Sequence, residues 1–155
     1  MSFRQIDSDM QIKNSKEVSF STKIVEIKMD DFVVEELVKS KSQFNLDNFQ
    51  YEFNAGIGID LPRQELTVKL NTNIYSEIEK KNKIGHINSH GIFYVVNFSD
   101  ILKDWENKIP NFVLASFIGI VLSTTRGFLI DKSQDTLIEG AMIPIVNPLT
   151  FFPEK

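Results

Sequence analysis

Residues 110–126 constrain the fold of this 155-residue chain more than any other segment. The pattern predicts a helix, with Pro110 at its first position and Gly127 just beyond its end. Its apolar side chains lie all around the circumference: Phe112, Val113, Leu114, Phe117, Ile118, Ile120, Val121 and Leu122. A helix that is apolar on all sides must be buried on more than one side. We therefore expect one side to pack on the chain's own sheet and another to meet a partner.

The same segment is expected to be a core helix and not a membrane span. Its apolar run from Phe112 to Leu122 is interrupted by Ser116 and Gly119, whereas a span needs about 20 apolar residues. The N-terminal residues lack the basic start and apolar run of a signal peptide. The chain has no cysteine, which excludes disulfides and thiolate chemistry and fits a reducing compartment. We expect a cytoplasmic protein that is not integral to the membrane.

Charge and length exclude one class of partner and favour one domain. The net charge is −4, with 17 basic residues scattered among 21 acidic ones. Nucleic-acid binding depends on clustered Lys and Arg, so it is not expected here. A chain of this length is expected to form a single domain over residues 1–155.

Alternating apolar residues predict the strands of an antiparallel sheet. The clearest strand spans 49–59, and a third spans 66–74 after a turn at 61–64. A fourth, 92–98, is apolar on both faces and should be central; the first lies within residues 1–29, and 30–43 could be a helical turn or a connection. A bulge is expected near Asp47–Asn48. The predicted fold class is α+β: a four-stranded antiparallel sheet covered on one face by a long helix in the C-terminal half.

The segments around the main helix complete the outline. Helical spacing of apolar residues predicts a short helix over 98–105, with Ser99 as its N-cap. The prolines at 144, 148 and 153 exclude a helix at the C-terminal end, so we expect an extended segment laid along the surface.

No cluster in the sequence predicts catalysis, a metal or a cofactor. His86 and His90 are the only histidines, and their context favours exposed loop residues over a metal pair. Gly56 and Gly58 lack the third glycine of a dinucleotide-binding loop. Residues 123–126 end a helix without a nearby base, and the acidic pairs at 30–31 and 35–36 are expected to be solvated. An enzyme, such as a thioesterase whose sheet wraps a helix, remains a minor alternative.

Aromatic residues are the most suggestive feature for function. The chain has 13 phenylalanines, and the pattern places an aromatic strip on the second strand near the helical region. The candidate peptide-binding residues are Phe44, Phe49, Tyr51, Phe53, Trp105 and Phe112. Rigid aromatic side chains suit the binding of varied apolar segments. Whether the strip faces the core or an open groove stays undecided from the sequence.

The order of the elements resembles the SecB family of protein-export chaperones and its SecB-like relatives. The resemblance rests on Gly91-Ile92-Phe93, on Pro110-Asn111-Phe112, on the helix end Ser123–Gly127 and on the tail 143–152. Residues 16–20 (KEVSF) also resemble the family's first-strand pattern.

The resemblance implies a holdase that works without ATP, cofactor or catalysis and assembles as a dimer or a dimer of dimers. Clients would be unfolded or extended polypeptides, held in apolar grooves. The helices would pack between dimers, and the expected oligomer interface is Phe112, Phe117 and Val121.

Two departures make contact with the secretion motor uncertain. The family's first-strand motif carries an acidic pair; Glu17 matches its first member, but Ser21 stands at the second position. The sequence given also ends at Lys155, before the family's C-terminal helix and acidic tail. A second hypothesis is therefore a dedicated module for one partner, such as an antitoxin, without general chaperoning.

Overall fold

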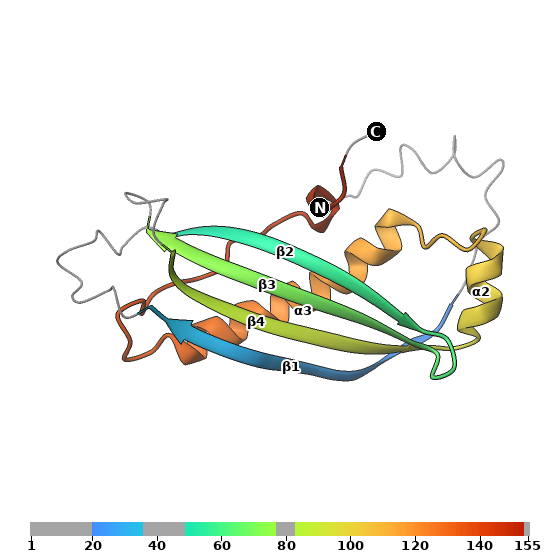
Figure 1. Ribbon diagram of the computed structural model, residues 1–155, viewed down its shortest axis with the longest axis horizontal. Helices are drawn as coiled ribbons and strands as arrows, with labels where there is room; N and C mark the ends of the chain where they lie inside the picture. The colour runs from blue at the N-terminus through green and yellow to red at the C-terminus, as the bar shows by residue number, and fades with distance from the viewer. Residues whose placement is uncertain (1–19, 36–48, 77–82, 154–155) are drawn as a thin grey trace, which may run out of the picture.

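The computed structural model describes residues 20–35, 49–76 and 83–153. Within these ranges the chain forms four strands followed by helices, which confirms the predicted α+β class (Figure 1). The elements are β1 (Thr22–Val34), β2 (Phe49–Asp60), β3 (Glu65–Ser76), β4 (Lys83–Val95), α2 (Phe98–Asp104), α3 (Asn111–Lys132) and the 3-10 turn η1 (Pro148–Phe151).

The strands form one antiparallel sheet in the order β1-β4-β3-β2. β2, β3 and β4 are the predicted meander, and β1 adds to the far side of β4. β4 is therefore a central strand, as its apolar character on both faces predicted. β1 and β2 are the edges, and β1 carries register shifts at Ile24/Glu26 and Met29/Asp31.

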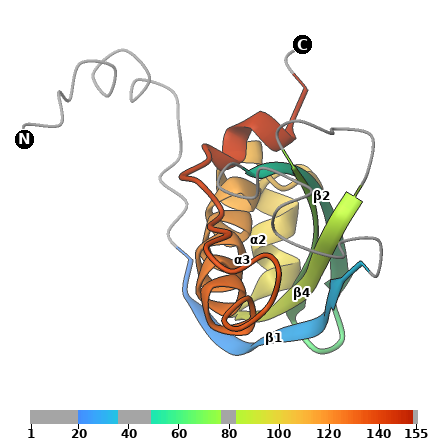
Figure 2. The ribbon, with the colours of Figure 1, turned by 90° about the vertical axis from the view of Figure 1, so that its left-hand side faces the viewer.

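α3 covers one face of the sheet, and Figure 2 shows it enclosed by the curved strands. Alternate residues of β3 and β4, among them Leu70 and Phe93, are fully buried under it. At Gly91 the helix comes so close that an added Cβ would lie 2.6 Å from Val121 Cγ2. The Ser89 and Thr125 hydroxyls also join β4 to α3, 2.6 Å apart in the buried layer.

Several predicted boundaries were wrong. α3 does not end at Gly127 but continues to Lys132, because Leu129 in its last turns is fully buried. β4 begins at Lys83 instead of near Gly91. β1 runs through to Val34, so residues 30–34 are strand and not a helical turn. The short helix begins at Phe98 with Asn97, not Ser99, in the cap position.

The prediction of exposed loop histidines was also wrong. Both lie in β4, with side chains only 18% exposed, and not in an exposed loop. His90 lies between Asp30 and Glu26, 2.7 and 3.1 Å from their carboxylates, and His86 lies 3.1 Å from Asp31. These contacts join β1 to β4 on the face that α3 leaves open. Within the described ranges, no group of three or more His, Cys, Asp or Glu is placed to hold a metal ion.

α3 is long and apolar enough to cross a membrane by length and composition alone. The sequence predicted a helix that ends at residue 126, and that shorter helix was judged too short to cross a membrane. The observed helix runs to Lys132, so its length no longer excludes a span. Its buried side, which includes Val113, Phe117 and Val121, packs in the core under the sheet, and the core helix of a soluble protein can pass the same test.

Some predictions concern residues outside the described ranges. These are the beginning of the first strand within residues 1–19, with Glu17, and the bulge near Asp47–Asn48, with Phe44.

Candidate peptide-binding surface

The aromatic strip, Phe49, Tyr51 and Phe53, lies on the inner face of the edge strand β2. Tyr51 and Phe53 pair with Ile74 and Thr72 of β3, which are both fully buried. Directly opposed residues point to the same side of an antiparallel sheet, so the strip faces the α3 side. All three side chains are half-buried. The strip is thus neither interior core nor open surface, but the margin of the core.

Burial changes the chemistry of the strip at Tyr51. It raises the pKa of Tyr51 to about 12, while the nearby backbone of Met142 opposes the rise. The ring stacks with Phe53 at 6.3 Å between centroids and an interplanar angle of 16°. The Tyr51 hydroxyl makes no well-formed hydrogen bond within the described ranges. This side chain therefore acts mainly as an apolar surface.

The C-terminal turn, which we define as residues 147–152, lies over the end of the strip. The Phe151 ring lies 6.1 Å from that of Phe53 at an angle of 58°. Beside this contact is an open hollow of about 320 Å³, the strip hollow. Its lining residues are Phe53, Asn54, Ala55, Val146, Thr150 and Phe151.

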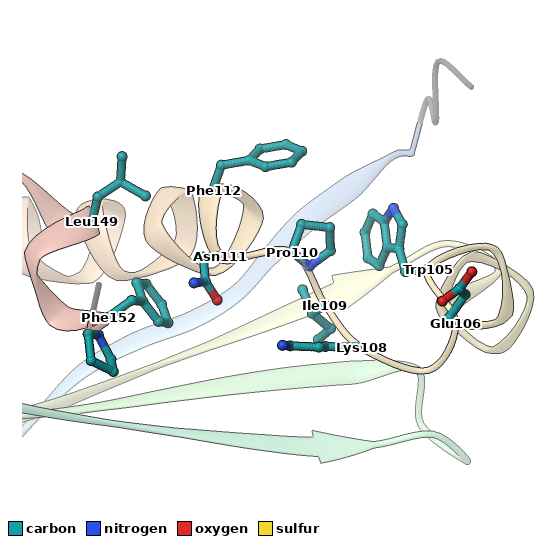
Figure 3. Close-up of a pocket in the computed structure, with 10 residues that line it drawn as sticks. Trp105, Glu106, Lys108, Ile109, Pro110, Asn111, Phe112, Leu149 and Phe152 are labelled. Atoms are coloured by element: carbon teal, nitrogen blue, oxygen red, sulfur yellow. The ribbon is translucent and has the colours of Figure 1, made fainter. Parts of the chain in front are cut away.

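A larger hollow of about 760 Å³, the helix hollow, lies at the beginning of α3 (Figure 3). It brings together Trp105 and Phe112, which the sequence had proposed as peptide-binding residues. The other lining residues are Glu106, Lys108, Ile109, Pro110, Asn111, Leu149, Phe152 and Pro153. A smaller hollow of about 320 Å³ beside Gly119 shares Phe112 and Leu149 with it. The lining of the helix hollow is mostly apolar, with one acidic residue, Glu106, and one basic residue, Lys108.

The candidate residues thus fall into two groups separated by the C-terminal turn. Phe53 lines one hollow, and Trp105 and Phe112 line the other. Phe49 and Tyr51 line neither hollow, although they belong to the same strip. The sequence missed the turn's own contribution from Leu149, Phe151 and Phe152. The Phe151-Phe152 pair was recognisable as part of an extended surface segment, but not which surface it would meet.

The proposed oligomer residues lie in different environments. Phe117 and Val121 are 5% and 0% exposed, so they belong to the subunit's own core, where Phe117 packs on Phe93. Phe112 is 67% exposed. The outward side of α3 also exposes Ile120 and Ile130, at 38% and 42%, among small and polar residues. The sequence had indicated a helix that is apolar on all sides. In the structure, the side of α3 that faces solvent carries small and polar residues as well as apolar ones.

The chain thus forms a four-stranded antiparallel sheet with a long helix on one face and a C-terminal turn packed on the edge strand β2. One similar solved structure is the SecB-like chaperone of Mycobacterium tuberculosis in complex with a ChAD peptide from the HigA1 antitoxin. The TM-score is 0.50 at 8% sequence identity, over 81% of this chain and 90% of that one. This likeness shows that the chain has a SecB-like fold. No protein-family model and no curated protein matches the sequence.

Proposed function

We propose that this protein is an ATP-independent, SecB-like chaperone that holds unfolded or extended polypeptide segments. The observation that carries the proposal is the pair of aromatic-lined hollows on either side of the C-terminal turn. Both are open, and both are lined by aromatic residues that are at least partly exposed. Binding would come from apolar burial, which needs no catalytic group and no cofactor.

Aromatic hollows of this kind suit clients of varied sequence. Trp105, Phe112 and Phe53 offer large apolar area at little loss of side-chain freedom. Exposed apolar surface on a soluble protein commonly marks an interaction site. The structural neighbour supports the proposal because it is a SecB-like chaperone solved with a bound peptide.

A second candidate function is a dedicated module for one partner, without general chaperoning. The observation that favours it is the neighbour's ligand, which is a peptide from an antitoxin. A pull-down from the native host distinguishes the two functions. One dominant partner would support the dedicated module, whereas many unrelated partners would support the holdase.

The chaperone proposal is tested by suppression of aggregation. The purified protein should keep several unrelated unfolded clients soluble at stoichiometric ratios without ATP, and Phe112→Ser should weaken this activity. Ile59→Ser is the control, because Ile59 is also an exposed apolar residue, at 46%, but lines neither hollow. If the wild type suppresses the aggregation of no client, the general holdase is refuted.

We also propose that copies of the chain assemble, as a dimer or a dimer of dimers, in the cytoplasm. The outward side of α3 is the surface available for this, through Phe112, Ile120 and Ile130. Light scattering should give a mass above that of one chain, and Phe112→Ser should lower it. A monomer at all concentrations would refute the assembly. Contact of Glu17 with a secretion motor stays a separate proposal, to be tested by binding to that motor.

A further inference from the structure

The chain beyond α3 consists of two parts that are held in different ways. The first part is anchored by Ala141 and Ile143, which are both 1% exposed. Arg126 donates from Nε to the Ile143 carbonyl at 2.6 Å and from Nη2 to the Pro144 carbonyl at 2.9 Å. Ile145 then follows with 95% of its surface exposed. The next residue, Val146, is again partly buried against the core.

The C-terminal turn is held together by its own hydrogen bonds. The Asn147 side chain accepts from the Leu149 N–H at 3.1 Å. The Asn147 carbonyl accepts from the Thr150 N–H and hydroxyl at 3.0 and 2.7 Å, and the Leu149 carbonyl accepts from the Phe152 N–H at 3.1 Å. In the part of the chain that the structure describes, these hydrogen bonds all stay within the turn and do not reach the sheet or α3.

Side-chain packing is what seats the turn on the rest of the molecule. Phe151 packs on Phe53, and Pro148 packs on α3 at Gly119. A Cβ built on Gly119 would lie 3.2 Å from Pro148 Cγ, and nothing else lies within 4 Å of it. The turn can thus leave without breaking a hydrogen bond to the sheet or α3, and without disturbing the bonds to Arg126.

We infer that the C-terminal turn is an internal competitor, with Phe151 occupying on Phe53 the place that a client's aromatic side chain takes. This inference rests on the proposed function and adds one chemical feature of the preferred client: an aromatic residue that packs on Phe53. The turn separates the strip hollow from the helix hollow, because Phe151 lines the first while Leu149 and Phe152 line the second. Its departure joins them into one continuous groove.

Competition of this kind lowers the apparent affinity for a client by the fraction of molecules in which the turn is open. If about one molecule in ten is open, full opening would tighten binding up to about tenfold. The closed turn shields Phe53 from water while no client is bound, and this burial favours the closed state.

The experiment unseats the turn without altering the aromatic residues. In Gly119→Leu the new Cβ would lie 3.2 Å from Pro148 Cγ, so Pro148 must shift and the packing of the turn on α3 should loosen. Gly127→Leu is the matched control on the same helix, because nothing lies within 4 Å of a Cβ there. The readout is fluorescence anisotropy of a labelled extended peptide containing one phenylalanine, compared with the same peptide carrying serine instead. Gly119→Leu should bind the phenylalanine peptide several-fold more tightly, and Gly127→Leu should match the wild type.

A second variant keeps the test decisive if Gly119→Leu fails to fold. Phe151→Ala removes the competing ring, so it should also tighten binding of the phenylalanine peptide. If Phe151 were instead a wall of the site, this variant would bind more weakly, and the inference would be overturned. Equal affinities for wild type and both variants would overturn it as well. If neither the wild type nor any variant binds peptide, it is the proposed function that has failed.

Discussion

Gly91 is the position at which the structure makes its sharpest energetic prediction. A Cβ there would lie 2.6 Å from Val121 Cγ2 and 3.1 Å from Phe93 Cε2. Val121 is fully buried, and a β-branched side chain in a helix has essentially one rotamer. Phe93 is held by Phe117, 4.7 Å away between centroids. Neither neighbour can turn aside, so Gly91→Ala must push α3 away from β4.

The magnitude follows from two opposing effects. Overpacking a well-packed core typically lowers stability by about 1–3 kcal/mol. Alanine is better than glycine in a strand by about 0.5–1 kcal/mol, which offsets part of the loss. We therefore expect Gly91→Ala to lower the free energy of unfolding by up to about 2.5 kcal/mol. The clash should be relieved in Gly91→Ala/Val121→Ala, whose loss should fall short of the sum of the single losses by about 1 kcal/mol.

Urea unfolding at one fixed protein concentration measures these differences. Gly56→Ala is the control on the edge strand β2, since nothing lies within 4 Å of its Cβ, and it should be neutral or slightly stabilising. If Gly91→Ala were as stable as Gly56→Ala, or if the double variant lost the full sum of the single losses, the direct packing of α3 on β4 would be refuted.

Further predictions concern a hydroxyl, a cation and a buried hydrogen bond. Tyr51→Phe should be at least as stable as the wild type near neutral pH, because it removes a buried hydroxyl without a well-formed hydrogen bond in the described ranges. Burial raises the pKa of Tyr51 from 10.0 to about 12, so alkali ionises this hydroxyl first in the unfolded chain and lowers the stability of the wild type. The urea midpoints of the wild type and Tyr51→Phe should therefore diverge above pH 10. A difference between the two midpoints that does not change with pH would contradict this. Arg126→Gln should cost about 1–3 kcal/mol in the same assay, because two carbonyls lose a charged donor. Ser89→Ala should cost only about 1 kcal/mol, since Thr125 keeps its bond to the Val121 carbonyl at 2.7 Å. If Arg126→Gln or Ser89→Ala had no effect on stability, the hydrogen bonds that the variant removes would be refuted.

The parts of the fold that follow a simple period were predictable. β2 and β3 alternate strictly, so their bounds and pairing were anticipated closely. β4 was recognised only in its second half, because Gly85, Asn88 and Ser89 interrupt the apolar pattern. Those residues fit the strand for tertiary reasons: Gly85 lies against the Val33 carbonyl, and Ser89 bonds to Thr125. No local pattern contains that information.

The end of α3 shows the same limit. Gly127 with Arg126 before it is a common helix ending, but here Gly127 lies on the exposed side, where it neither caps nor packs. The helix continues because Leu129 is buried against the core. Arg126 does not cap the helix either, because its side chain donates to carbonyls of the C-terminal segment. The first of these carbonyls belongs to Ile143, which lies 17 residues further along the chain.

The candidate site was predictable in its residue types but not in its arrangement. The aromatic strip followed from alternation, and Trp105 and Phe112 from their positions just before and at the beginning of the main helix. Their separation into two hollows depends on where residues 147–152 lie. The prolines predicted an extended segment there, but the contact of Pro148 with Gly119 is a matter of tertiary packing.

The widths of the elements explain why the aromatic face of β2 is only partly covered. Neighbouring strands are about 4.8 Å apart, whereas a helix with its side chains is about 10 Å wide, so one helix cannot cover four strands. α3 packs mainly against β1, β3 and β4, and the inner face of β2 lies beyond it. That face carries aromatic rings, which are costly to leave in water. The chain covers the end of the strip with Phe151, through a turn held by side-chain packing. Under the proposed function, a client segment with an aromatic residue would provide the same cover at this edge.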